Sequence, residues 1–176
     1  MTTALLIIDM QRATCSGEWA VTGADTLIDK INLLSARARA SGTPVVFVQH
    51  EEDEGPFQFD TQGWGIADGL VTAAEDIRVR KKTPNSFHRT DLHQILRERG
   101  ISRVVVCGVQ TECCVDTTVR QALPLGYDVV LASDAHSTLD GALRAEQIIA
   151  HHNRTLADMQ AFGPRIDVVP AAEVAF

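Results

Sequence analysis

Short runs of aliphatic and β-branched residues alternate along this chain with segments whose apolar residues recur at helical spacing. The runs cover residues 4–8, 45–49, 77–81, 104–108, 129–133 and 166–169. Apolar runs of this length are typical of parallel strands that are covered on both faces. The alternation therefore predicts an α/β fold with a single doubly wound, mostly parallel six-stranded sheet and helices on both faces.

The segments between these runs predict the helices. Leu27, Ile31, Leu34 and Ala38 share one helical face between the first two runs, and further helices are expected over residues 90–99, 112–125 and 140–159. Residues 51–69 fit neither pattern, because they are acidic at first and then rich in glycine and aromatic residues, so a functional loop or lid is expected there. The length of 176 residues, without repeats or a linker, predicts one domain over 1–176.

The charge and the apolar pattern exclude several classes of partner. A net charge of −7 with scattered basic residues argues against nucleic-acid binding, and no apolar run is long enough to span a membrane. The apolar stretch at residues 4–8 is short, follows no basic residue and ends at Asp9, so we expect a cytoplasmic protein. In that compartment the four cysteines are expected to be thiols. A small-molecule substrate fits these observations best.

Polar residues follow the predicted strands, and the carboxyl ends of parallel strands meet at one edge of a sheet, where ligands bind. Asp9 follows the first strand, Lys81 ends the third, and Cys113 and Cys114 come shortly after the fourth. His50 ends the second strand, and Asp134 and His136 follow the fifth. Each residue alone often merely ends a strand or fills a core. Their convergence on one edge predicts a site.

The segment Gly108 to Val115 predicts a nucleophilic cysteine. Thr111 suits the N-cap of a helix, which would place Cys114 in the first turn. Backbone amides and the helix dipole stabilise a thiolate there, and the same amides would stabilise an oxyanion formed by its attack on a carbonyl. Asp9 is a candidate for the base that takes the thiol proton.

Other chemistries fit the residues less well. Cys114 and Arg120 have the C-x5-R spacing of cysteine phosphatases, but the intervening residues lack glycine and include Asp116, which would repel a phosphate. An aspartyl-phosphate enzyme would have a second carboxylate where Gln11 stands, and no nucleotide-binding motif is present, so no cofactor is expected. A redox pair of Cys113 and Cys114 would require a distorted helix. A binding or scaffold protein without activity remains an alternative from another class, although it does not explain Asp9 and Lys81.

Four segments carry a resemblance to a known superfamily: "ALLIIDMQ", "VRKKTPNSFHRTDL", "VVVCGVQTECCVDTTVRQALPLGYDVVLASDAHST" and "AEQIIAHHNRTL". On these segments the chain resembles the isochorismatase-like cysteine hydrolases, which include nicotinamidases and carbamoyl amidases. The resemblance implies a catalytic triad of Asp9, Lys81 and Cys114. Phe87 fixes the register that selects Lys81 over its neighbour, and the valine after Cys114 selects that cysteine over Cys113. The Cys113 side chain is expected to pack behind the helix.

The resemblance also implies a cis peptide between Val109 and Gln110, with an oxyanion hole formed by the amides of Gln110 and Cys114. Nicotinamidases bind a metal through one Asp and two His after the second strand, whereas this chain has only His50 and Asp53 there, so no metal is expected. The residues expected to line the substrate pocket are Phe87, Trp64, Trp19, Gln11, His50 and His136.

The function that follows is hydrolysis of a C–N amide bond, linear or cyclic, through a thioester on Cys114. Some relatives that cleave the enol ether of isochorismate lack the cysteine, and that reaction is the alternative. The resemblance further implies a homo-oligomer, either a dimer or a tetramer. The sequence leaves the acyl group and the leaving amine open.

Overall fold

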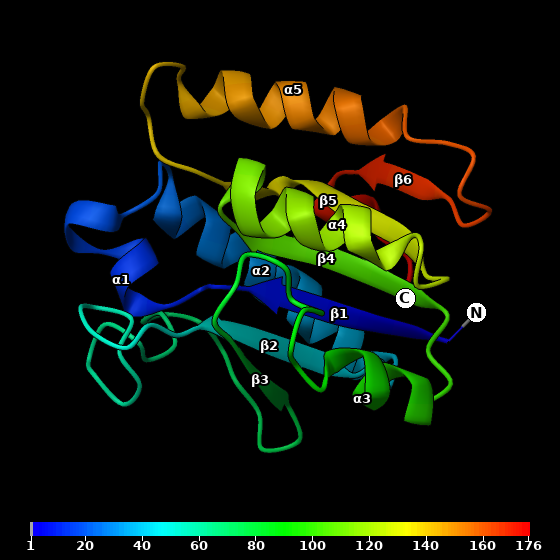
Figure 1. The fold of residues 1–176 in the computed structure, drawn as a ribbon, viewed down its shortest axis with the longest axis horizontal. Coiled ribbons are helices and arrows are strands. Elements are labelled where there is room, and N and C mark those ends of the chain that lie inside the picture. Colours follow the sequence, from blue (N-terminus) through cyan, green and yellow to red (C-terminus); the bar gives the residue numbers. More distant parts are fainter. Residues whose placement is uncertain (1) are drawn as a thin grey trace.

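One six-stranded sheet organises the protein, of which the computed structural model describes residues 2–176 (Figure 1). The strand order is β3-β2-β1-β4-β5-β6, and every neighbouring pair is parallel. This confirms the predicted fold class. The strands are β1 (Thr3–Ile8), β2 (Val45–His50), β3 (Ile77–Lys81), β4 (Arg103–Val109), β5 (Asp128–Ser137) and β6 (Ile166–Val169).

Helices cover both faces of the sheet (Figure 1). The helix α2 (Ala24–Ala40) and the short turn η3 (Ala171–Glu173) pack on one face through an apolar cluster that includes Leu27, Ile31 and Leu34. The other face is covered by α3 (Leu92–Glu98), α4 (Asp116–Ala122) and α5 (Ala145–Ala157). Alternate residues of β1 enter the two clusters, so the central strand is buried on both sides.

The centre of the sheet is also its topological switch point. Strand order runs outward from β1 to β2 and β3 on one side and from β4 to β5 and β6 on the other. The segments that leave the carboxyl ends of β1 and β4 therefore diverge, and ligands bind in the crevice that this divergence opens. Asp9 leaves β1 at this point, and the segment that carries Cys114 leaves β4.

Gly108 allows β1 and β4 to lie together at this end. Its φ is +116°, and a Cβ atom there would lie 2.1 Å from the carbonyl oxygen of Ile8. A side chain at this position would force the two strands apart. The glycine thus determines the spacing between Asp9, directly after Ile8, and the segment that begins at Gln110.

Several predicted element boundaries were wrong. The helix expected over 112–125 is divided into a π-helical turn, η2 (Thr111–Val115), and α4. The helix expected over 140–159 begins only at Ala145, because the Asp140 side chain accepts a hydrogen bond from the Ala145 amide and holds the preceding residues in a bend. The short helix α1 (Arg12–Cys15) and the turn η1 (Gly17–Trp19) were not predicted.

The loop expected over residues 51–69 is present and contains no helix or strand. An isolated bridge of Glu52 with Gln58 joins two parts of the loop, and a bridge of Gln11 with Ile66 holds the loop against the segment that follows β1. In Figure 1 this loop, in cyan to green, lies beside α1 at the carboxyl edge of the sheet. It therefore forms one side of the crevice.

Candidate active site

Asp9 occupies a fixed and buried position at the end of β1. Its φ is +51°, a left-handed conformation that is uncommon for residues other than glycine but is tolerated by aspartate. Its backbone amide donates to the carbonyl oxygen of Val48 at 2.8 Å, and the Thr14 hydroxyl donates to its carbonyl oxygen at 2.7 Å. These bonds hold the turn so that the carboxylate faces the neighbouring strands.

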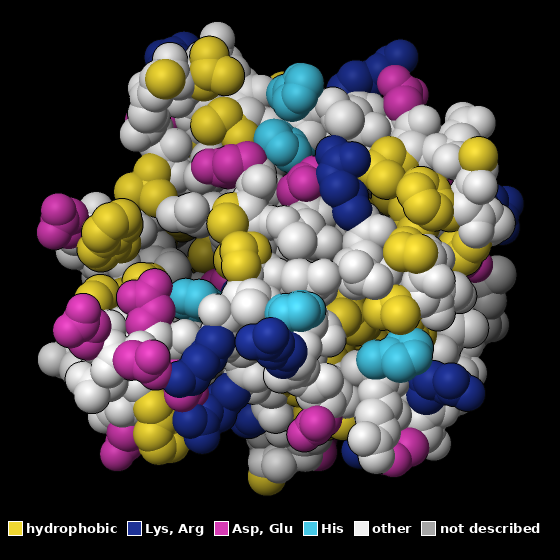
Figure 2. Space-filling model, viewed as in Figure 1, with side chains coloured by type: hydrophobic (Ala, Val, Ile, Leu, Met, Phe, Trp, Pro, Cys, Tyr) yellow, Lys and Arg dark blue, Asp and Glu magenta, His cyan; other side chains and the backbone are white. Residues whose placement is uncertain are grey.

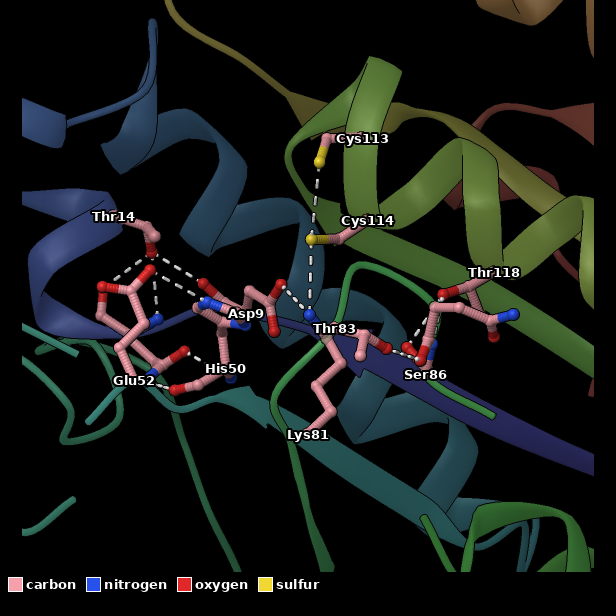
Figure 3. A network of polar contacts seen from close by, with 12 residues as sticks. Asp9, Thr14, His50, Glu52, Lys81, Thr83, Ser86, Cys113, Cys114 and Thr118 are labelled. Atoms are coloured by element: carbon pink, nitrogen blue, oxygen red, sulfur yellow. Dashed lines mark hydrogen bonds and ion pairs between the residues drawn. The ribbon is translucent and has the colours of Figure 1, made fainter. Parts of the chain in front are cut away.

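Lys81, the last residue of β3, reaches across β2 to this carboxylate. Its Nζ atom donates to Asp9 Oδ2 at 2.7 Å and to Cys114 Sγ at 3.3 Å (Figure 3). Burial alone would lower the pKa of Lys81, but Asp9 and Cys114 outweigh it and raise that pKa above its ordinary value. Lys81 is therefore an ammonium that joins the carboxylate to the thiol.

Cys114 and Cys113 follow β4 on the π-helical turn, and both sulfur atoms face the same space. The Cys114 thiol donates to Cys113 Sγ at 4.0 Å. This hydrogen bond lowers the pKa of Cys113 to about 7. The same bond, burial and the Asp9 carboxylate raise the pKa of Cys114 above that of an ordinary thiol. Cys114 is therefore the less acidic of the two thiols.

A cavity of about 230 Å³ opens in front of this thiol. Its walls come from the ends of β1, β2 and β4 and from the loop after β2, and the residues that line it are Asp9, Thr14, Trp19, His50, Glu52, Phe57, Pro84, Val109, Gln110, Cys113 and Cys114. The Val109–Gln110 peptide bond is cis. Gln110 and Cys114, whose amides were predicted to form an oxyanion hole, thus both border the cavity.

The structure places Trp19 and His50 in this cavity, as expected from the sequence. It also places Thr14, Glu52, Phe57, Pro84 and Cys113 there, which the sequence reasoning missed. Glu52 and Phe57 belong to the loop that was expected to be functional, so that loop was the available signal. Cys113 was expected to pack behind the helix, but a π-helical turn changes the direction of its side chain and turns it toward the cavity.

Gln11 was wrongly predicted to line the pocket. It is fully buried, and its side-chain amide donates to the carbonyl oxygens of His50 and Trp64 at 3.0 and 2.9 Å. Its Oε1 accepts a hydrogen bond from the His50 amide at 2.8 Å. Gln11 therefore ties the end of β1 to the end of β2 and to the loop, and both N–H groups of its side chain are used in these contacts.

The two further aromatic predictions were also wrong. Trp64 lines a separate cavity of about 590 Å³, whose lining also includes Val79 and Arg80 of β3. Phe87 is buried in the core and stacks on Tyr127 with their ring centroids 5.8 Å apart. Its place in the sequence fixes the register of Lys81, but its ring contacts the core and not the cavity.

His136 does not reach the cavity, because β5 continues past the predicted end and buries it within the strand. Its Nδ1 atom lies 2.9 Å from the Thr111 hydroxyl, and its Nε2 atom lies 2.9 Å from Asn153 Oδ1. Burial lowers the pKa of His136. Thr111 is thus bound by this imidazole. The prediction that it is the N-cap was wrong, because the N-cap residue is Gln110. Asp134 pairs instead with Lys30 at 2.7 Å.

A metal site would need ligands that converge. His50 Nε2 lies 3.2 Å from Glu52 Oε1, whereas Asp53 pairs with Lys82. Across residues 2–176, no three or more His, Cys, Asp and Glu side chains are grouped as a metal ion requires. The donors present therefore do not fit the three-ligand site of the nicotinamidases.

The sequence also matches the isochorismatase domain model over residues 3–163. The chain belongs to the isochorismatase family. It is 36% identical to a streptothricin hydrolase from Streptomyces noursei over 96% of its own length and 62% of that protein's length. It is 31% identical to a ureidoacrylate amidohydrolase from Pseudomonas syringae pv. syringae over 76% of its length and 69% of that protein's length.

A solved structure agrees with this assignment. A cysteine hydrolase from Pseudomonas syringae pv. phaseolicola has a TM-score of 0.89 at 26% identity, with 98% of this chain and 90% of that chain covered. The resemblance read from the sequence is therefore confirmed, and the protein is an isochorismatase-family hydrolase. None of the helices in residues 2–176 combines the length and the apolar character needed to cross a membrane.

Proposed function

We propose that this isochorismatase-family protein hydrolyses a C–N amide bond of a small molecule through a thioester on Cys114. The observation that carries the proposal is the position of Lys81 Nζ, 2.7 Å from Asp9 Oδ2 and 3.3 Å from Cys114 Sγ. Asp9 and Cys114, which Lys81 contacts, line a cavity of about 230 Å³, which is large enough for a compact amide. A carboxylate, an ammonium and a thiol at these distances supply a base, a fixed positive charge and a nucleophile.

In the first half of the reaction, Asp9 takes the thiol proton while Cys114 Sγ attacks the carbonyl carbon. The negative charge moves to the carbonyl oxygen, which the amides of Gln110 and Cys114 stabilise. The proton passes from Asp9 to the leaving nitrogen, the C–N bond breaks, and the amine departs. The acyl group then remains on Cys114 as a thioester.

In the second half, Asp9 takes a proton from water, and the resulting hydroxide attacks the thioester. The C–S bond breaks, the acid is released, and the sulfur regains its proton. Lys81 keeps its charge throughout and holds both the Asp9 carboxylate and the sulfur. The raised pKa of Cys114 supports this order of events, because a neutral thiol needs the base at the moment of attack.

The names of two relatives support the proposal. One is an amidohydrolase, which supports amide chemistry, and the other is a cysteine hydrolase, which supports a cysteine nucleophile. The retained cysteine distinguishes the proposal from hydrolysis of an enol ether, for which a thioester is not needed. The proposal does not fix the acyl group or whether the amide is linear or cyclic.

A substrate panel tests the proposal. Primary amides, carbamoyl amides, hydantoin-like rings and lactams would be assayed for release of ammonia or for ring opening. We expect turnover of at least one class, and loss of nearly all of it in Cys114→Ser, which keeps the size of the side chain but replaces the nucleophile. Turnover in Cys114→Ser equal to that of the wild type would contradict the proposal.

A further inference from the structure

The walls of the active-site cavity carry an uneven set of charges. Asp9 and Glu52 line it, and none of its lining residues is a lysine or an arginine. Lys81 touches the cavity floor only through its contacts with Cys114 and Asp9, and the Asp9 carboxylate balances its charge. Glu52 is therefore the one lining carboxylate that the triad does not neutralise.

The basic residues on either side of Lys81 are paired with other carboxylates. Arg80 donates to Glu51 at 2.5 Å, and Lys82 pairs with Asp53. Hydrogen bonds from these two cations lower the pKa values of Glu51 and Asp53. Figure 2 shows acidic and basic side chains side by side at the left of the molecule, where the loop after β2 lies in Figure 1. These cations do not line the cavity, so they offer no partner to an anionic ligand inside it.

Glu52 has a partner that leaves it free to bind a cation. Its Oε1 lies 3.2 Å from His50 Nε2, and its side chain is 51% exposed. A carboxylate has about four acceptor sites on its two oxygens, so the contact with His50 leaves others open. The exposed carboxylate of Glu52 thus offers acceptors to the N–H groups of a ligand.

Aromatic rings complete this wall. Trp19 and Phe57 line the cavity, and the rings of Phe57 and His50 meet edge to face with centroids 5.7 Å apart. The face of an aromatic ring attracts a cation and gives no such attraction to an anion. An ammonium group would therefore gain from Glu52 and from the rings, whereas a carboxylate in the same place would meet the charge of Glu52.

We infer that the cavity selects amides that carry a positively charged amino group a few bonds from the scissile carbonyl, and that it discriminates against anionic amides. This inference rests on the proposed amide hydrolysis for its substrate class, while the charge selection is a property of the cavity itself. Glu52 acts as the residue that determines specificity, and the triad performs the same chemistry on every amide that enters.

Matched substrates test the inference through kcat/KM. The value of kcat/KM should be highest for the cationic 4-aminobutanamide, lower for the neutral butanamide and lowest for the anionic succinamate. Glu52→Gln should lower the ratio of kcat/KM for the cationic amide to kcat/KM for the neutral amide about three- to tenfold. Glu54→Gln is the matched control, because Glu54 stands in the same loop without lining the cavity. This variant removes the same net charge and should leave the order and the ratios of the three kcat/KM values unchanged. Equal preferences in the wild type and Glu52→Gln would overturn the inference.

A second measurement needs no hydrolysis. Two methanethiosulfonates of the same reactive group, one with a trimethylammonioethyl arm and one with a sulfonatoethyl arm, would be used to modify the cavity thiols. The thiolate displaces methanesulfinate and forms a mixed disulfide, which mass spectrometry locates on Cys113 or Cys114. The rate with the cationic reagent is divided by the rate with the anionic reagent, and this ratio is divided by the same ratio for N-acetylcysteinamide. The result should exceed one in the wild type and should fall several-fold in Glu52→Gln but not in Glu54→Gln.

The two measurements separate the possible failures. Biased thiol modification that depends on Glu52, without hydrolysis of any amide, would support charge selection and contradict the proposed function. Amide hydrolysis through Cys114 without a charge preference, together with equal rates for the two reagents, would support the function and overturn the inference.

Discussion

Lys81 and Asp9, which are 72 residues apart, form an ion pair of 2.7 Å whose side chains are 0% and 5% exposed. The strand order brings them together, because β2 lies between β3 and β1 and all three end at the same edge. Charges removed from water in this way are stable only as a pair, since either one alone would have no compensation. Under the proposed mechanism, the pair therefore links the activity of the protein to its stability.

Lys81→Met should lower turnover at least about a hundredfold and the free energy of unfolding by about 3–5 kcal/mol. The reason for the second loss is that the Asp9 carboxylate is left buried and unpaired. The double variant Lys81→Met/Asp9→Asn should regain much of the stability but none of the activity. Denaturant unfolding and turnover of the single and double variants measure both effects. A normal rate of turnover in Asp9→Asn would show that Asp9 is not the base.

The two adjacent thiols should differ in function. Cys114→Ser should lose nearly all turnover, whereas Cys113→Ala should retain most of it, because only Cys114 Sγ contacts Lys81 Nζ. The structure adds a second expectation: the pKa of Cys113, about 7 in the wild type, should rise in Cys114→Ala, which removes the donating thiol. The pH dependence of alkylation at Cys113, followed by peptide mapping, gives this pKa. Equal losses of turnover in the two single variants would contradict the assignment of the nucleophile.

His136 should make the stability fall in mildly acidic solution. Burial lowers its pKa in the folded protein, whereas in the unfolded chain a histidine has a pKa near 6.5. As the pH falls below that value, the unfolded chain binds a proton that folded His136 does not. The free energy of unfolding then decreases by up to about 1.4 kcal/mol per pH unit until the lowered pKa is reached.

The variant His136→Gln tests this dependence. It should be less stable at pH 7.5, since the bond to Thr111 is altered, but its free energy of unfolding should decline less than that of the wild type between pH 6.5 and 5. His88→Gln, an exposed position, is the control and should keep the wild-type slope. A His136→Gln slope equal to that of the wild type would show that His136 titrates alike in the folded and unfolded states.

Removal of divalent metals should leave the protein unchanged. His50 and Asp53 are bound to different partners, Glu52 and Lys82, so they do not converge on one ion. Exhaustive treatment with a chelator should therefore alter neither turnover nor Tm. Loss of activity that zinc, iron or manganese restores would show that these two residues rearrange to hold a metal.

The sheet and the three groups at its edge could be predicted from the sequence because each depends on local pattern. A buried parallel strand requires a continuous apolar run, and the residue after each run necessarily lies at the carboxyl edge. Asp9, Lys81 and Cys114 meet for this reason, whatever the loops do. Their predicted proximity follows from topology alone.

The pocket walls could not be predicted in the same way, because they depend on where loops turn. Trp64 and Phe57 lie in the same glycine-rich loop, yet only Phe57 faces the cavity. His136 was misplaced because β5 continues through an irregularity in its pairing with β4, which apolar periodicity does not reveal. Cys113 was misplaced because a π-helical turn directs side chains differently from the α-helix that the pattern predicted.

The most direct test of the account is whether an acyl group resides on Cys114 during turnover. Rapid quench of the protein with a hydrolysed amide that is a poor acyl donor, followed by intact-protein mass spectrometry and peptide mapping, would measure it. We expect an added mass equal to the acyl group, located on Cys114 and absent from Cys114→Ser. Confirmed turnover of the same amide with no adduct, and with no loss of rate after Cys114 is alkylated, would contradict the mechanism and show that water attacks directly under the control of Asp9.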